Sequence, residues 1–210
     1  MQRLWCLSSA QTKASLFRNR AAKSAAACLQ RCSLRGVERI FDMARQTVTQ
    51  WIKAHVQHAP DFRETLLPAA PDDVLELDEI WSFVRKKEDP RWVWTALYRR
   101  TRQIVAFAIG DRSKATYLRL WKSIPEEYKH CHTFSAFWAA SKQVFPAETH
   151  GCVGKETGET AHIERWNNTL RQRVGRYVRQ TLSFSKSDEY HEIVTKWFLL
   201  QYNLSLSLTT

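Results

Sequence analysis

The stretch Val74-Leu-Glu-Leu-Asp-Glu-Ile-Trp-Ser-Phe-Val84 decides the fold. It is rich in β-forming residues, and its side chains alternate between the two sides of an extended chain. Glu76, Asp78 and Ile80 share one side, and the other side is mostly apolar, so the segment predicts a central strand. A carboxylate in the middle of such a strand is costly to bury without a partner, and a divalent metal ion is a suitable partner.

The residues after this strand predict a mixed α/β sheet with flanking helices. The expected elements are strands at 92–98 and 103–110, a helix from its cap Ser113 to about Ser123, a strand at 129–134, a helix at 137–144 and a strand at 148–154. This order is also that of the RNase H-like nuclease fold. In that fold, carboxylates from the first strand, the end of the fourth strand and a later helix hold two Mg²⁺ ions.

Residues 28–58, before the acidic strand, predict a small all-α module of two helices and a tight turn. Apolar residues recur at helical spacing in 33–41 and again in 45–56, and the break between them is Asp42-Met43-Ala44. Asp42 replaces the Gly that such turns often use, and Asp can also adopt turn geometry. The pattern is typical of a DNA-binding helix-turn-helix, and an ordinary helical hairpin with a polar face is an equal alternative. The residues expected to contact DNA are Arg45, Gln46, Thr47, Thr49, Gln50 and Lys53.

Residues 158–175, GETAHIERWNNTLRQRVG, predict a helix that carries one carboxylate beside several arginines. Thr160 is a candidate cap, and an apolar stripe of Trp166, Leu170 and Val174 lies opposite Glu164. Residues 165–186 contain six Lys or Arg and no acid, which indicates a metal-binding Glu164 beside phosphate-binding cations. The alternative is a surface glutamate in local ion pairs. The DNA-binding candidates of this segment are Arg165, Asn168, Arg171, Arg173, Arg176, Arg179 and Lys186.

The charge distribution favours a nucleic-acid partner. The 210 residues carry a net charge of +11, yet residues 61–98 hold nine acids against five bases. A polyanionic partner together with metal-binding carboxylates explains this pattern better than a pure binding module or a structural protein. No apolar run approaches the roughly 18 residues of a membrane helix, so we expect no membrane contact. Five cysteines without a CxxC pair favour a reducing compartment over a disulfide framework.

The ends of the chain and the connections between its parts are less informative. Residues 1–27 form an unassigned basic tail whose composition resembles that of an organelle transit peptide. Regular patterning begins only near Ala25, which favours a tail without a stable fold or a segment translated out of the ancestral frame. Residues 59–71 contain three prolines and predict a linker, and 72–205 form the main domain. The histidines for which we expect ordinary structural or surface roles are His132, His150, His162 and His191.

Five segments together resemble the transposases of the insertion-sequence-one family. They are SLRGVERIF (33–41), RQTVTQWI (45–52), ELDEIWSFV (76–84), ETAHIERWNNTLRQRVGRYVRQTLSFSKS (159–187) and FLLQYN (198–203). The resemblance implies a DDE transposase with an RNase H-like catalytic domain. It would bind the inverted repeats of its own element as double-stranded DNA, and would cleave and join DNA with Mg²⁺ or Mn²⁺. It also implies a homo-oligomer on DNA in the prokaryotic cytoplasm, associated with the nucleoid.

By position in that resemblance, Asp78 is the first catalytic, metal-binding carboxylate and Glu164 the third. The second is expected at the end of the fourth strand, where Ala136 stands and cannot bind a metal. The other acids that we considered as replacements are Glu76, Glu79, Glu126, Glu127 and Glu148. The paired-cysteine zinc module usual in the family has no counterpart in residues 1–27. The sequence therefore predicts a degenerate transposase, with a catalytically dead DNA-binding remnant that represses transposition as the alternative.

Overall fold

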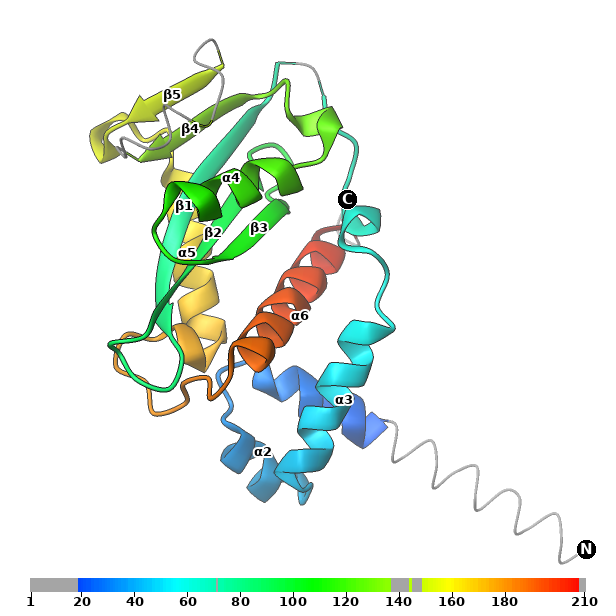
Figure 1. Ribbon diagram of the computed structural model, residues 1–210. Coiled ribbons are helices and arrows are strands. Elements are labelled where there is room, and N and C mark those ends of the chain that lie inside the picture. The colour runs from blue at the N-terminus through cyan, green and yellow to red at the C-terminus, as the bar shows by residue number, and fades with distance from the viewer. Residues whose placement is uncertain (1–18, 71, 137–143, 145–148, 208–210) are drawn as a thin grey trace, which may run out of the picture.

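The computed structural model describes residues 19–70, 72–136, 144 and 149–207. Its centre is one five-stranded sheet with the order β3-β2-β1-β4-β5 (Figure 1). The strands are β1 (Val74–Phe83), β2 (Pro90–Tyr98), β3 (Ile104–Gly110), β4 (His132–Ala136) and β5 (His150–Val153). The first three form an antiparallel meander, and β4 and β5 run parallel to β1. The mixed α/β sheet predicted from the sequence is thus confirmed, with β4 three residues later than expected at its start.

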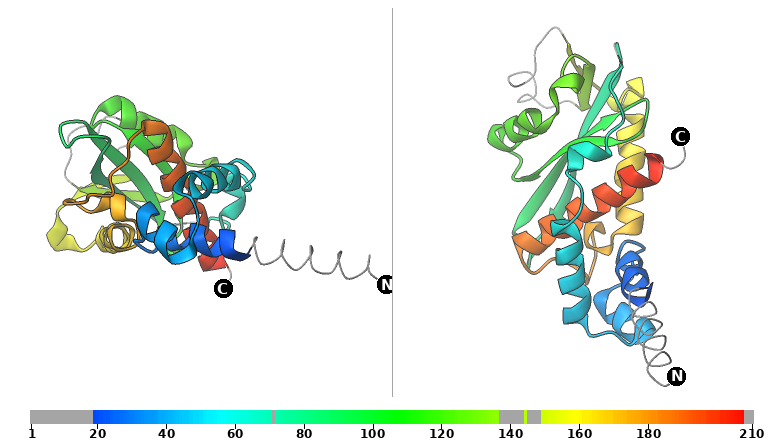
Figure 2. Two further views of the ribbon diagram at one scale, coloured as in Figure 1. Left: turned by 90° about the horizontal axis from the view of Figure 1, so that it is seen from below. Right: turned by 90° about the vertical axis from the view of Figure 1, so that its right-hand side faces the viewer.

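The alternation of side chains along β1 separates two apolar cores. Leu75 and Leu77 pack with Tyr117 and Leu120 of α4 (Lys114–Ser123) on one face of the sheet. On the other face, Ile80 joins the core formed with α5 (Ala161–Arg173) and α6 (Asp188–Ser207). Figures 1 and 2 show α4 on one side of the sheet and α5 and α6 on the other. The expected cap of α4 is also present, because the Ser113 hydroxyl accepts a hydrogen bond from the backbone N–H of Thr116.

The N-terminal helices form the expected hairpin of α2 (Leu34–Phe41) and α3 (Arg45–Gln57). Asp42 ends α2 in the left-handed conformation, with φ 48° and ψ 52°, and so takes the place of the glycine common in such turns. Val48 and Ile52 of α3 are buried in the same core as Trp197 of α6. The right-hand view of Figure 2 shows α6 running between these helices and the sheet. The hairpin therefore shares a core with the main domain.

Two boundaries differ from those expected. Residues 19–28 are helical and Ser24 is fully buried, so the folded part begins before residue 27. The expected linker contains a short 3₁₀ helix, η1 (Phe62–Thr65), and is attached to the sheet and to α6. The Gln103 side-chain amide donates to the Thr65 carbonyl (2.7 Å), and the Asn203 amide donates to the Thr65 hydroxyl (3.3 Å). These buried polar contacts fix the connection in one conformation. The helix expected at 137–144 lies almost entirely outside the described residues.

None of the helices in the described ranges is both long and apolar enough to cross a bilayer. The longest, α6, interrupts its apolar face with buried polar groups such as His191, Thr195 and Asn203. His191 Nε2 lies 3.1 Å from the Ser82 hydroxyl of β1, and its Nδ1 lies 2.8 Å from the Ser185 hydroxyl. Burial, together with the charge of Arg176, lowers the pKa of His191 to about 4. The ring is therefore neutral in the native protein and joins α6 to the sheet.

This burial predicts a loss of stability in mild acid. In the unfolded chain His191 regains its ordinary pKa of 6.5, so between about pH 6.5 and pH 4 the unfolded state binds more protons. The contribution of the neutral His191 ring to the free energy of unfolding is complete above pH 6.5. It should decrease by about 3 kcal/mol as the pH falls to about 4. Urea denaturation across this range measures it. The His191→Gln variant should lose this part of the pH dependence, and the exposed control His130→Gln should keep it. If the two variants show the same dependence of unfolding free energy on pH, the effect does not come from His191.

Candidate active site on the central strand

Asp78 lies in the middle of β1, on the face that α5 covers, and is half-buried. Its Oδ2 accepts a hydrogen bond from the Asn167 side-chain amide of α5 at 2.7 Å. Burial, together with the charges of the neighbouring carboxylates Glu79 and Glu164, raises the pKa of Asp78 to about 7. The negative charge on Asp78 is therefore poorly stabilised by the protein alone, and a cation at this position would compensate it.

Glu164 lies in the first turn of α5, and its Oε1 accepts a hydrogen bond from the Thr160 hydroxyl at 3.2 Å. Its charge acts on Asp78, so the structure brings the two predicted catalytic carboxylates into electrostatic range of each other. Thr160 occupies the N-cap position of α5, but its hydroxyl makes no cap hydrogen bond to the backbone. Thr160 is therefore the cap residue, as predicted, but its side chain does not satisfy the free backbone N–H groups of the helix.

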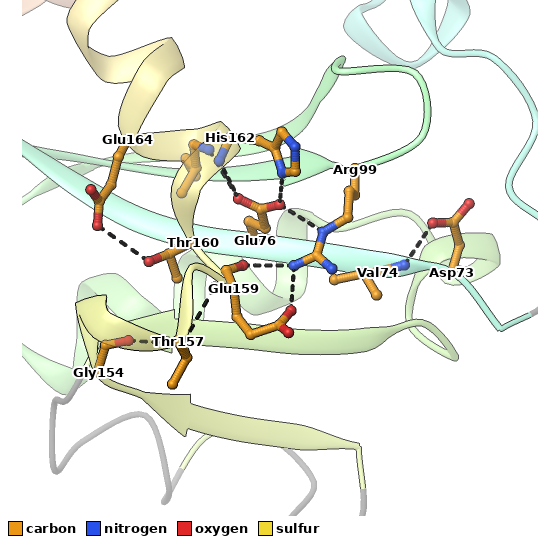
Figure 3. A network of polar contacts seen from close by, with 11 residues as sticks. Asp73, Val74, Glu76, Arg99, Gly154, Thr157, Glu159, Thr160, His162 and Glu164 are labelled. Carbon is orange, nitrogen blue, oxygen red and sulfur yellow. Dashed lines mark hydrogen bonds and ion pairs between the residues drawn. The ribbon is translucent and has the colours of Figure 1, made fainter.

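Glu76, fully buried on the same face of β1, supplies the missing cap (Figure 3). Its Oε2 accepts the backbone N–H groups of His162 (2.9 Å) and Ile163 (3.0 Å). Its Oε1 accepts from Arg99 Nε (2.8 Å) and faces His162 Nδ1 (2.6 Å). A carboxylate at a helix N-terminus also interacts favourably with the helix dipole. Glu76 thus joins the start of α5 to the central strand and fixes where Glu164 and Asn167 lie.

Three of the other acids considered as a third ligand have partners within the protein. With four donors around it, Glu76 has no capacity left for a metal ion. Glu79 lies on the opposite face of β1, where its carboxylate pairs with Arg112 at 2.6 Å. Glu126 pairs with Lys129 at 2.5 Å, outside the sheet. Glu148 lies outside the described residues. Within the part of the chain that the structure describes, no three His, Cys, Asp or Glu residues are grouped to hold a metal ion.

The backbone register places Ala136 next to Asp78. Leu77 of β1 pairs with Ser135 of β4, and the two strands are parallel. The residues that follow this pair, Asp78 on β1 and Ala136 on β4, are therefore neighbours at the same level of the sheet. Ala136 is also the last residue of β4, in register with Val153 of β5. The position at which the family resemblance expects the second carboxylate is therefore adjacent to the first, and it carries a residue without a ligand atom.

Asn167 is the site residue that the sequence analysis missed. It is buried, its amide nitrogen contacts Asp78, and its Oδ1 has no hydrogen-bond partner in the described protein. The neighbouring Asn168, which was predicted as a DNA-binding residue, is exposed. The available signal was the helical spacing, since residue 167 follows Glu164 by three positions and shares its side of the helix.

The predicted DNA-binding residues of α3 divide into free and paired side chains. Gln46 and Gln50 are exposed and Thr47 is half-buried. Arg45 pairs with Glu38 at 3.0 Å, and Lys53 pairs with Glu189 of α6 at 2.7 Å. The Thr49 hydroxyl donates to the Arg45 carbonyl. The polar face of α3 is thus partly neutralised within the protein, and its exposed centre carries amides.

The DNA-binding residues predicted after Glu164 lie along α5 and in the segment that follows it. Arg165, Asn168, Arg179 and Lys186 are exposed. Arg171 and Arg173 are half-buried, and each has an Nε atom without a partner in the described chain. Burial and the charge of Arg179 lower the pKa of Arg171, while Asp78 acts in the opposite direction. Arg171 therefore lies in electrostatic range of the central carboxylate. Arg176 is half-buried beyond the end of α5.

The comparisons with known proteins agree with this arrangement. The sequence model of the IS1 transposase family matches residues 74–204, which is the span from the start of β1 into α6. The iso-IS1n InsB protein of Shigella dysenteriae is 35% identical over 126 residues, covering 60% of this chain and 93% of that protein. The IS1 InsB protein of Shigella flexneri is 35% identical over 124 residues, covering 59% and 92%.

An IS1 InsB protein of Escherichia coli K12 is 34% identical to this chain over 124 residues. The match covers 59% of this chain and 72% of that protein. The family match begins at Val74, so α2 and α3 lie outside it. It includes the strand that carries Asp78, the helix that carries Glu164 and the position held by Ala136. On these grounds the chain belongs to the IS1 transposase family.

Proposed function

We propose that this chain is an insertion-element transposase that binds double-stranded DNA at the element's terminal repeats, and that its DNA cleavage and strand transfer are weak or lost. The observation that carries the proposal is the group of Asp78, Asn167 and Glu164 on one face of the sheet, beside Ala136. The strand order β3-β2-β1-β4-β5, with the first carboxylate on the central strand, supports an RNase H-like catalytic domain over 72–205.

The oxygen atoms at this site are of the types that bind Mg²⁺ or Mn²⁺. Asp78 and Glu164 would hold the ion through carboxylate oxygens, and the unpartnered Asn167 Oδ1 offers a third oxygen of the kind that these hard cations prefer. When bound, such an ion would activate the attacking water or 3′-hydroxyl and stabilise the leaving oxygen. The protein's own part is to hold both carboxylates in place through Glu76 and to bring Arg171 close to the phosphate.

DNA recognition is proposed for α2 and α3 acting as a helix-turn-helix, with Gln46, Gln50 and Thr47 towards the bases. Glutamine can form two hydrogen bonds with the major-groove edge of adenine, through N6 and N7, and the basic residues around it would contact phosphates. Because an element has two ends, we propose a homo-oligomer on DNA, within the bacterial cytoplasm and near the nucleoid. The second candidate, a repressor that occupies element ends without cutting, is favoured by the absence of a third acid among the described residues.

Binding and nicking of one labelled duplex test the proposal. The duplex carries the end of the element, and a scrambled duplex of equal length is the control. We expect preferential binding of the element end that weakens steeply with salt, and no nicking above background in Mg²⁺. Equal binding of both duplexes, or none, would contradict end recognition. Nicking that Asp78→Asn abolishes would show that this copy is active and that its third ligand lies elsewhere.

A further inference from the structure

A cavity of about 830 Å³ lies between the N-terminal helices and the segment that follows α5. Seven of its lining residues are Arg or Lys, and none is Asp or Glu. Arg35, Arg39, Arg45 and Lys53 come from α2 and α3, Arg31 precedes them, and Arg176 and Lys186 come from the opposite wall. The volume falls within the range of about 300–1,000 Å³ that is usual for ligand pockets. We call this cavity the basic pocket.

Arg176 lines the basic pocket, and within the described part of the chain its guanidinium contacts neutral partners. Its Nη1 donates to the Ser185 hydroxyl at 2.8 Å, and its guanidinium lies 5.2 Å from the centre of the Tyr190 ring. Ser185 is buried and also contacts His191, so the arginine is held in position. Burial lowers the pKa of Arg176. A cation withdrawn from water without a counter-charge is unfavourable, so this site is built to receive an anion.

The remaining cations show how much charge is left uncompensated. Arg45 and Lys53 have carboxylate partners in Glu38 and Glu189. Arg31, Arg35 and Arg39 are exposed at the mouth of the pocket and form no ion pair with another described residue. Serine hydroxyls, among them Ser33, add hydrogen-bond donors to the lining. Guanidinium groups together with hydroxyls are the set of donors that recognises phosphate oxygens in a bidentate manner.

We propose that the basic pocket binds phosphate groups of a DNA backbone that passes over the mouth of the pocket along α2. This inference rests on the proposed DNA binding and gives it a location. A strand is favoured over a free anion because the unpaired arginines continue from the pocket onto the exposed face of α2. The occupant would contact both walls at once, since α2 contributes Arg35 and Arg39 and the segment after α5 contributes Arg176.

Such a contact would set the distance from the DNA anchor to the carboxylates. Ten residues of α5 and its end separate Glu164 from Val174, which also lines the pocket. At 1.5 Å per residue this is about 15 Å along the helix. One DNA strand carries a phosphate about every 3.4 Å along the duplex axis, so a duplex running parallel to α5 would have its anchored phosphate about four nucleotides from the site of cleavage.

The test compares two double variants that remove the same charge. Arg35→Gln with Arg39→Gln neutralises exposed residues of the pocket mouth, and Arg63→Gln with Lys122→Gln neutralises exposed residues elsewhere. Fluorescence anisotropy of the labelled element-end duplex, without divalent ions, gives the affinity from 50 to 200 mM salt. The pocket variant should bind at least about tenfold more weakly, and its salt slope should be smaller by about 1 to 2 units; the control should match the natural chain.

Three results would overturn the proposal. Equal losses in the two double variants would mean a diffuse electrostatic effect with no defined pocket. Unchanged duplex binding in the pocket variant would leave DNA binding intact and remove the pocket from it. If inorganic phosphate raises the melting temperature of the natural chain but not of the pocket variant, while both bind DNA equally, the site holds a free anion. A natural chain that binds no duplex at all would instead defeat the proposed function itself.

Discussion

Replacing Ala136 with aspartate should give the protein a Mg²⁺-dependent DNA-nicking activity at least about a hundredfold above that of the natural chain. A missing metal ligand costs several kcal/mol of transition-state stabilisation, and each ~1.4 kcal/mol is tenfold in rate. The register of β1 with β4 puts position 136 beside Asp78, so a carboxylate there reaches the same ion. Asp78, Asn167 and Glu164 are already held by α5 and need no rearrangement.

The measurement is the rate of nicking of the labelled element-end duplex in Mg²⁺ and in Mn²⁺. Ala136→Asn introduces a side chain with nearly the same shape as aspartate but without its charge. It is the matched control and should give at most a small gain in the rate of nicking. Combining Ala136→Asp with Asp78→Asn should return the rate to background, which separates the site's chemistry from a contaminating nuclease. A variant that binds the duplex normally yet cuts no faster than the natural chain would contradict the placement of the second carboxylate at residue 136.

Replacing Glu76 with alanine should lower the free energy of unfolding by about 3–5 kcal/mol, the usual cost of removing one member of a buried ion pair. The change leaves Arg99 without its buried partner and leaves the N–H groups of His162 and Ile163 without an acceptor. Glu76→Gln keeps the shape and one acceptor oxygen, so its loss should be intermediate. Urea denaturation gives these values, and hydrogen exchange at residues 162 and 163 reports directly on the start of α5.

Arg99 itself offers the control. It also pairs with Glu159 at 2.8 Å, but Glu159 is partly exposed, and exposed pairs contribute about 0–1 kcal/mol. Glu159→Gln should therefore change stability little. If Glu76→Ala and Glu159→Gln destabilise the protein equally, the capping role of Glu76 is wrong. Because Glu76 forms no hydrogen bond with Asp78 in the described chain, slower cleavage by Glu76→Gln combined with Ala136→Asp than by Ala136→Asp alone would reflect displaced positions of Glu164 and Asn167.

The sequence predicted those features that depend on local periodicity. The alternation along β1, the apolar stripe of Trp166, Leu170 and Val174, and the Ser113 cap all arise within a few residues, and each is present. Glu76 was considered as a possible ligand because it shares a strand face with Asp78. Its real partners, Arg99 and His162, are 23 and 86 residues away, and no local pattern pairs residues at such distances.

The candidate site was predicted in part for the same reason. The sequence analysis marked Asp78 and Glu164 as catalytic, but it did not include Asn167, whose amide contacts Asp78; it named only the neighbouring Asn168, as a DNA-binding candidate. Helical spacing alone admits both asparagines, and only the direction in which α5 is held against β1 distinguishes them. The N-terminal hairpin gave a similar result, because its own pattern predicted α2 and α3 but could not reveal that α3 is buried against Trp197.

The core that α3 shares with α6 restricts how this transposase can evolve. DNA-binding parts are often exchanged between enzymes as independent cassettes, each folding regardless of its neighbour. Here a new hairpin would have to supply apolar side chains where Val48 and Ile52 now lie, or Trp197 would face water. If the hairpin reads the element end as proposed, specificity for a new end is therefore more accessible through point changes on the outer face of α3 than through replacement of the hairpin.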